Sequence, residues 1–220
     1  MTGKLVLVRH GETEGNVAKI LDTKLPGLPL TERGVAQAKA FGARLPVRPS
    51  MLLHSHALRA AQTAAYIEAT TGVPAVSCED VYEVQVGDLD GATATAAHEQ
   101  FQDIYLRWHE GYLTERVPGG ETGEDLLNRF LPQVERLRAE YLDGAPSGDV
   151  LLVTHGAAMR LVGKVLGNVQ PPFTTNNHLD NTETIELVPL PGGGWECVRW
   201  GRFTQPFGTK AEPGADDPMG

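Results

Sequence analysis

Short apolar runs alternate with segments of helical periodicity along this chain. Residues 4–9, 51–54 and 149–154 are rich in Leu and Val with few polar interruptions, which is typical of strands buried on both faces of a sheet. Apolar positions three and four residues apart predict helices at 31–45, 58–71, 92–113, Thr122 to about Tyr141, and 157–166. The alternation predicts a single-domain α/β fold, a three-layer α/β/α sandwich with a mostly parallel central sheet.

Local signals support several of these boundaries. Thr31 can cap the helix that follows it, and Gly72 fits the position just after a helix. Thr122 and Asp125 have the spacing of a capping box. Pro132 lies inside the same periodic segment, so we expect it to kink that helix or to start a new one.

The C-terminal part of the chain has a different pattern. Residues 182–188 and 195–200 are β-rich and flank a Pro-Gly-Gly-Gly turn, which predicts a hairpin. Residues 204–220 are rich in Pro, Gly and Asp, which is typical of a mobile tail. We therefore assign residues 1–203 to the domain and residues 204–220 to the tail.

Polar residues follow the ends of the three predicted buried strands. Arg9 and His10 end the first, and His155 and Gly156 come directly after the last. Arg59 follows the middle strand at the start of the next helix. Because the carboxyl ends of parallel strands meet at one edge of a sheet, beside helix amino termini, these residues predict an anion site suited to phosphate.

The overall charge excludes some classes of partner. The 220 residues include 19 Lys and Arg and 28 Asp and Glu, a formal net charge of −9. An acidic chain without a basic face is a poor partner for nucleic acid or for an anionic membrane. Phosphate binding must therefore depend on a local positive pocket.

Other sequence features indicate neither a metal-binding site nor secretion. His54 and His56 stand two residues apart, as a metal pair can, but no Asp, Glu or Cys accompanies them at ligand spacing. We expect His98, His109 and His178 at the surface. Cys78 and Cys197 lie far apart, as reduced thiols of a cytoplasmic protein do, and no signal peptide or membrane-spanning stretch is visible. We predict no cofactor and no metal.

Several sequence blocks together resemble the histidine phosphatase superfamily, the phosphoglycerate mutase-like branch 1. They occur in family order and span most of the chain. The matching blocks are Arg9-His10-Gly11-Glu12-Thr13 with Asn16, Pro29 to Gly34, Ser55 to Ala64, Glu83 with Gly87 to Gly91, Pro118 to Thr122, and Val153 to Gly156 with Arg160.

The resemblance implies a mechanism for these residues. The imidazole of His10 is the candidate nucleophile, which forms a phosphohistidine. Glu83, which would otherwise pass for an ordinary loop residue, is implied to be the general acid and base. Glu12 is also acidic and close in sequence to the site, and we expect it to hold local structure and not to transfer protons. The groups implied to bind the phosphoryl oxygens are those of Arg9, Asn16, Arg59, His155 and Gly156.

The chain departs from the family pattern at a few positions. Gly15 stands where many members have an aromatic residue, Ala57 where Leu is common, and Leu89 where Trp is common. The segment 19–23 lacks the usual Arg and Gln-Gly pair. None of these removes a catalytic group, so they bear on the identity of the substrate.

Three functions fit such a site: a phosphomonoesterase, a 2,3-bisphosphoglycerate-dependent phosphoglycerate mutase, and a silent phosphate-binding module. The module is disfavoured because every catalytic group is present. A mutase needs extra cations for a second anionic group, yet Arg107 and Arg116 are the cations available between Glu83 and Pro118. We therefore predict hydrolysis of small phosphorylated metabolites, and leave a homodimer open.

The segment 92–117 has one further candidate role. Its apolar stripe is typical of core packing, but it lies where family members build the cover over the substrate. We expect one edge to pack inward and Trp108 or Tyr112 to reach the site. The stripe consists of Phe101, Ile104, Tyr105, Trp108 and Tyr112.

Overall fold

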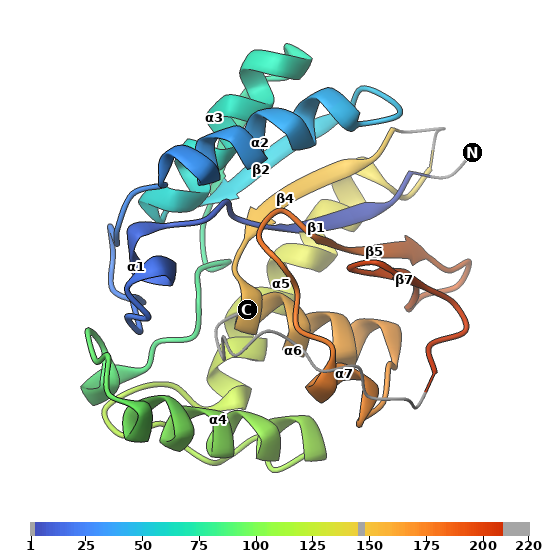
Figure 1. The fold of residues 1–220 in the computed structure, drawn as a ribbon. Coiled ribbons are helices and arrows are strands. Elements are labelled where there is room, and N and C mark those ends of the chain that lie inside the picture. The colour runs from blue at the N-terminus through green and yellow to red at the C-terminus, as the bar shows by residue number, and fades with distance from the viewer. Residues whose placement is uncertain (1–2, 145–147, 209–220) are drawn as a thin grey trace.

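A seven-stranded sheet separates two layers of helices (Figure 1). The structure is a computed structural model that describes residues 3–144 and 148–208. The strands are β1 Leu5–Arg9, β2 Met51–Ser55, β3 Ala75–Cys78, β4 Val150–Thr154, β5 Thr184–Pro189, β6 Trp195–Trp200 and β7 Phe203–Thr204. The helices are α1 Glu14–Val17, α2 Glu32–Arg44, α3 Leu58–Thr71, the 3-10 helix η1 Gly87–Leu89, α4 Thr95–Glu110, α5 Gly123–Tyr141, α6 Gly156–Gly167 and α7 Phe173–Asn176.

The sheet is mixed, so the prediction of a mostly parallel sheet is only partly confirmed. Its strand order is β3-β2-β4-β1-β5-β6-β7. The first four strands in this order are parallel, whereas β5, β6 and β7 continue the sheet antiparallel. The connection between β5 and β6 explains why these two strands are antiparallel. The short glycine-rich turn after β5 leaves no room for a crossover, so β6 must pair antiparallel.

Both faces of the parallel half are buried, as predicted. In β1, Leu5 and Leu7 point into the core shared with α5 and α6, and Val6 and Val8 point to the opposite face. On that face they pack with Ala60, Ala64 and Ile67 of α3 and with Phe41 of α2. Successive side chains of a strand alternate between faces, so this continuous apolar run fills two cores at once. The three-layer sandwich is confirmed.

The capping predictions are confirmed, and of the two outcomes predicted for Pro132 the start of a new helix is excluded. Thr31 caps α2, and Thr122 and Asp125 form a reciprocal capping box at α5. Gly72 ends α3 in the left-handed region. However, α5 continues through Pro132 and no new helix begins there. Phe130 and Val134 are fully buried beside Pro132, and burying two such side chains offsets the roughly 3 kcal/mol that an internal proline costs.

Contacts with the domain continue past residue 203. The Phe207 ring packs against Phe173 with centroids 5.0 Å apart, and Gln205 Nε2 donates to Cys197 O at 2.6 Å. The rest of the predicted mobile tail, residues 209–220, lies outside the described residues. Cys78 and Cys197 are buried and form no disulfide. Within the described ranges, no helix combines the length and apolar character needed to cross a membrane.

Candidate active site

The ends of β1 and β4 bring two histidines together. Arg9 at the end of β1 pairs in register with Thr154 at the end of β4, and the His10 N–H donates to Thr154 O at 3.1 Å. His155 directly follows Thr154 and precedes the first residue of α6. The rings of His10 and His155 therefore lie beside each other, with centroids 5.3 Å apart. The predicted convergence of strand ends is confirmed for this pair.

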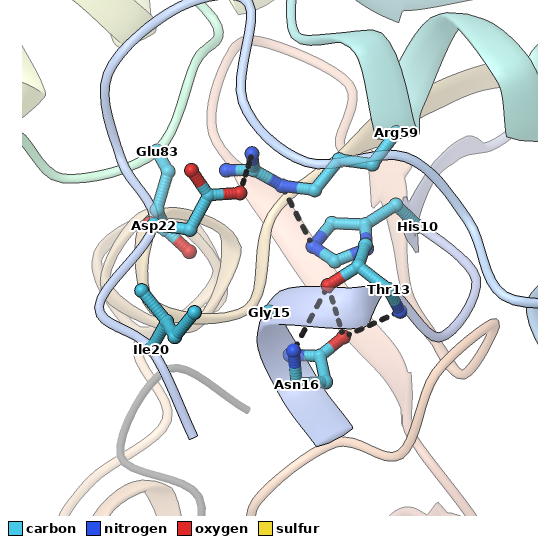
Figure 2. Close-up of a pocket in the computed structure, with 8 residues that line it drawn as sticks. All are labelled: His10, Thr13, Gly15, Asn16, Ile20, Asp22, Arg59 and Glu83. Atoms are coloured by element: carbon cyan, nitrogen blue, oxygen red, sulfur yellow. Dashed lines mark hydrogen bonds and ion pairs between the residues drawn. The ribbon is translucent and has the colours of Figure 1, made fainter. Parts of the chain in front are cut away.

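The third strand end supplies Arg59, which joins the two rings. Its Nε lies 3.1 Å from His10 Nε2 and 3.2 Å from His155 Nδ1 (Figure 2 draws the first contact). A guanidinium N–H can only donate, so both of these ring nitrogens are acceptors. His10 Nδ1 lies 2.8 Å from Gly11 O, and His155 Nε2 lies 2.8 Å from Ser55 Oγ. Each neutral ring thus carries its proton on the nitrogen that faces away from Arg59.

Burial and positive charge keep both imidazoles neutral. Burial is the largest cause that lowers the pKa of His10 well below its ordinary value, and the charges of Arg59 and Arg9 lower it further. The pKa of His155 is likewise well below its ordinary value, first through burial and then through Arg59. A neutral His10 with its proton on Nδ1 has an unprotonated Nε2, whose lone pair accepts from Arg59. That nitrogen has the state required of a nucleophile.

Close backbone contacts fix the loop that carries His10. A Cβ on Gly11 would lie 2.6 Å from Gly34 O, and a Cβ on Gly34 would lie 2.0 Å from Glu12 O. Larger residues at either position would separate this loop from the start of α2. The Glu12 carboxylate accepts from Thr31 Oγ1 at 2.8 Å and lies 3.2 Å from Arg33 Nη1. These contacts suit the structural role predicted for Glu12.

Glu83 is held at the amino end of α6, on the same side of the sheet edge. Its Oε1 accepts from the backbone N–H groups of Val84 and Ala158, each at 2.8 Å, and its Oε2 accepts from Ala157 N at 3.1 Å. Burial raises the pKa of Glu83, although these three N–H groups and the charge of Arg59 oppose the rise. A buried carboxyl with a raised pKa can hold a proton for transfer.

A pocket opens between these groups, as Figure 2 shows. Asn16 lines it, with its Oδ1 accepting from Thr13 N and Thr13 Oγ1. Of the residues predicted from sequence, Arg9, His155 and Gly156 are buried next to the pocket rather than lining it. The lining residues are His10, Thr13, Gly15, Asn16, Ile20, Asp22, Arg59 and Glu83.

Comparison with known proteins identifies the arrangement. Residues 5–202 match the profile of the histidine phosphatase superfamily (branch 1). The chain belongs to this superfamily. It is 35% identical to a 2,3-bisphosphoglycerate-dependent phosphoglycerate mutase of Methylobacterium sp. (strain 4-46), over 84% of this chain and 88% of the relative. It is 30% identical to a glucosyl-3-phosphoglycerate phosphatase of Mycobacterium tuberculosis, over 90% and 91% of the two chains.

Solved structures agree with the sequence relatives. The native structure of mycobacterial glucosyl-3-phosphoglycerate phosphatase superposes with a TM-score of 0.78 at 26% identity, covering 91% of this chain and 99% of that one. Its complex with inorganic phosphate superposes with a TM-score of 0.76, also at 26% identity, covering 90% and 97%. The chain is thus an enzyme of the histidine phosphatase type, in a group that contains both phosphatases and mutases.

The structure of this histidine phosphatase adds Arg129, which sequence reasoning missed. Its guanidinium donates to the backbone carbonyl groups of Asp80, Tyr82 and Glu83 at 2.8–3.0 Å. It also pairs with both oxygens of Glu121, at 2.7 and 2.9 Å, and stacks on the Tyr82 ring 3.7 Å away. Arg129 therefore anchors the loop that carries the candidate acid.

Helix α4 and the turn that follows it do not contribute the side chains expected of them. Trp108 is fully buried with Nε1 donating to Glu115 O, and Tyr112 is 55% exposed, and neither lines the pocket. Tyr105 has a closer link, since its hydroxyl donates to Ala157 O at 2.7 Å, at the start of α6. His109 was expected at the surface but is buried, and its Nδ1 contacts Thr174 Oγ1 at 3.0 Å. Its position one helical turn after Tyr105 places it on the packed face.

The described ranges contain no set of three or more His, Cys, Asp or Glu side chains that could hold a metal ion. His54 directs its Nδ1 to Ser55 O at 2.9 Å, and His56 is exposed.

Proposed function

We propose that this histidine phosphatase is a phosphomonoesterase that hydrolyses small phosphorylated metabolites through a phosphohistidine on His10. The alternative is a 2,3-bisphosphoglycerate-dependent phosphoglycerate mutase, in which the bound acid takes the phosphoryl group back. Relatives of both kinds match the chain at similar identity, 35% and 30%. The choice therefore rests on the residues of the pocket.

The first step forms the covalent intermediate. The lone pair on His10 Nε2 attacks phosphorus, and the bond from phosphorus to the ester oxygen breaks. That oxygen leaves with the bonding electron pair and takes a proton from Glu83. Oε2 is the oxygen suited to this transfer because it accepts one backbone hydrogen bond, whereas Oε1 accepts two. Proton donation of this kind contributes about 10²–10⁴-fold to the rate.

The second step returns the enzyme to its starting state. The ionised Glu83 takes a proton from water, whose oxygen attacks the phosphohistidine. The bond from phosphorus to Nε2 breaks, the electron pair returns to His10, and inorganic phosphate leaves. During both steps, the developing charge on the phosphoryl oxygens is stabilised by Arg59 and Asn16 in the pocket, with Arg9 and the amino end of α6 at Gly156 behind them.

His155 is assigned a place in the same phosphoryl site. Its Nδ1 and His10 Nε2 accept from one N–H of Arg59, so both nitrogens face the position of a bound phosphoryl group. The negative charge of that group favours a proton on Nδ1 of His155, since an adjacent opposite charge stabilises an imidazolium. His155 then becomes a further donor to the phosphoryl oxygens.

The observation that carries the choice of hydrolysis is the supply of cations. Among the described residues that line the pocket, Arg59 is the only one with a cationic side chain, and two acidic side chains, Asp22 and Glu83, share the space. Arg107 and Arg116 lie on the surface and pair with Glu115 and Asp125, at 2.6 and 2.9 Å. A mutase must hold a second anionic group while its substrate turns over. This pocket offers that group no dedicated cation.

The test compares the two reactions in one preparation. Wild-type enzyme is given p-nitrophenyl phosphate and several small phosphoesters, and phosphate release is measured. It is also given 3-phosphoglycerate with and without 2,3-bisphosphoglycerate, and formation of 2-phosphoglycerate is measured. We expect phosphate release and little or no isomerisation. Isomerisation that far exceeds hydrolysis would show that the mutase assignment is right.

A matched variant tests the covalent step. His10→Ala removes the nucleophile, so we expect neither turnover nor an acid-labile phosphoenzyme after incubation with labelled substrate. Loss of both also rejects the silent binding module, provided that the wild type is active. EDTA leaves the wild-type rate unchanged if the reaction proceeds through these side chains alone. Inhibition by the chelator would reveal a metal requirement.

A further inference from the structure

The pocket contains a second carboxylate that the proposed reaction does not use. Asp22 lines it together with Glu83, and Figure 2 shows both on one side, with Thr13 and Asn16 on the other. The Asp22 side chain is 17% exposed, and its Oδ2 lies 3.4 Å from Nη1 of the buried Arg59. A negative charge thus stands beside the cation assigned to the phosphoryl group.

The surrounding backbone is shaped around this ion pair. The N–H of Leu28 donates to Asp22 Oδ2 at 2.8 Å. Gly27 has a φ of +76°, and a Cβ there would lie 2.6 Å from Arg59 Nη1 and 3.1 Å from Asp22 Oδ2. A Cβ on Gly15 would lie 3.3 Å from the Asp22 Cβ, so a large side chain at position 15 would displace Asp22. Two glycines therefore make room for the carboxylate.

One oxygen of Asp22 remains available to a ligand. Both contacts given above use Oδ2, and no described residue forms a hydrogen bond with Oδ1. An ionised carboxylate oxygen accepts hydrogen bonds and cannot donate them. Oδ1 can therefore accept from a hydroxyl or ammonium group of the alcohol that leaves, and it repels any anionic group placed there.

We propose that Asp22 is a specificity-determining residue, an inference that rests on the proposed phosphatase function. It selects phosphate monoesters whose alcohol carries a hydroxyl or ammonium donor and no second anionic group. The carboxylate acts on the leaving alcohol, while Arg59 continues to hold the phosphoryl oxygens.

The physical basis is repulsion in a partly enclosed space. Arg59 compensates the charge of the phosphoryl group, and the alcohol then faces the ionised Asp22, while Glu83 holds the proton that the leaving oxygen takes. Charges interact more strongly near protein than in bulk water, so a carboxylate on the alcohol raises the energy of the complex. A neutral hydroxyl at the same place forms a hydrogen bond instead. The repulsion of the carboxylate and the hydrogen bond to the hydroxyl together discriminate between the two kinds of alcohol.

The test uses two esters that differ at one group. Glycerol 3-phosphate and 3-phosphoglycerate share a three-carbon frame, and a carboxylate in the second replaces a hydroxymethyl in the first. We expect wild-type kcat/KM to favour glycerol 3-phosphate by at least about tenfold. Asp22→Asn keeps the shape and an acceptor for the Leu28 N–H but removes the charge. It should bring the ratio toward one, mainly through KM for 3-phosphoglycerate.

Glu14→Gln is the matched control, because Glu14 is an exposed acidic residue of α1 that does not line the pocket. It should leave the ratio at the wild-type value. Equal losses on both esters in Asp22→Asn, with an unchanged ratio, would show that Asp22 only supports the fold and would overturn the proposal.

A binding measurement separates this proposal from the phosphatase assignment and needs no Asp22 variant. In His10→Ala, dissociation constants of the two esters are measured by calorimetry at low and high salt. Both esters carry the same phosphate, so its salt dependence cancels in their ratio. We expect a preference for glycerol 3-phosphate that narrows with salt, as screening weakens the repulsion. Equal affinities at low salt would contradict the role of Asp22 even if the enzyme hydrolyses both esters.

Discussion

Arg59 donates its Nε–H to the Nε2 of His10 at 3.1 Å, the nitrogen assigned to attack phosphorus. This contact excludes a proton from Nε2, since the nitrogen must accept. The lone pair is engaged by the guanidinium until phosphoryl oxygens compete for the same N–H groups. In the proposed mechanism, substrate binding would therefore both position phosphorus and release the nucleophile.

The first prediction concerns the charge of Arg59. Arg59→Gln removes a cation that lowers the pKa of His10, so that pKa should rise. His10 is then protonated at higher pH, and the acidic limb of the kcat/KM profile should move to higher pH. Loss of a donor to the phosphoryl oxygens should also lower kcat by about 10²–10³-fold. Arg33→Gln, which replaces an exposed cation on α2, should leave the acidic limb in place. An unshifted limb in Arg59→Gln would contradict the electrostatic role.

The second prediction concerns the proton donor. Glu83→Gln removes the proton, so hydrolysis of alkyl esters should fall by about 10²–10⁴-fold. Aryl esters should lose much less, because their leaving groups depart without protonation. The measurement is the ratio of kcat/KM for an alkyl ester to that for p-nitrophenyl phosphate. Glu79→Gln, at an exposed position in the same region, should keep the wild-type ratio. Equal losses on the two ester types would assign the proton transfer to another group.

Local pattern and strand-end placement account for the part of the site that the sequence predicts. The runs ending at Arg9 and Thr154 identify buried strands, and adjacent parallel strands bring His10 and His155 together. The antiparallel extension was partly foreseeable from the hairpin signal around β5 and β6. The position of β5 next to β1 could not be predicted, because strand order depends on contacts between segments distant in sequence.

The remaining residues owe their positions to long-range contacts. Asp22 is placed by Arg59, 37 positions later, and Arg129 contacts carbonyl groups 46 to 49 positions earlier. Periodicity describes only neighbours within a helix or strand, so neither contact leaves a local signal. His109 is different: it lies four residues after Tyr105 on the packed face of α4, a spacing that the sequence does display.

The third prediction concerns Arg129 as a positioning residue. Arg129→Lys keeps the charge but cannot form the same set of bonds to three carbonyl groups and to Glu121. The loop carrying Glu83 should loosen, and misplacing the acid should lower kcat for alkyl esters by up to about 10²-fold. Aryl esters should be less affected, which is the signature predicted for Glu83→Gln. A merely structural role would lower both ester types alike.

A control variant and a double variant test whether Arg129 acts through Glu83. Arg136→Lys changes an exposed arginine of the same helix, paired with Glu140, and should preserve the ester ratio. Combining Arg129→Lys with Glu83→Gln should cost little more than Glu83→Gln alone, because both changes act through one proton transfer. Fully additive losses would show that Arg129 acts independently of Glu83.

The last prediction concerns stability in mild acid and depends on His109. Burial is the largest cause that lowers the pKa of His109 well below its ordinary value, with Arg160 and Lys164 adding to it. Below a pH of about 6.5 the unfolded chain binds a proton at this histidine that the folded protein does not, so the free energy of unfolding falls as pH falls. Each such group contributes a slope of at most about 1.4 kcal/mol per pH unit.

His109→Gln should therefore reduce this slope between pH 6.5 and 5, measured by urea unfolding, while phosphatase activity at neutral pH is retained. His10 and His155 contribute slopes of the same sign, and the raised pKa of Glu83 contributes one of opposite sign. These contributions are common to both proteins and cancel in the comparison. His98→Gln, at a partly exposed position of the same helix, is the control. A slope identical to that of the wild type in His109→Gln would mean that the buried ring binds its proton in the folded protein, despite the cations around it.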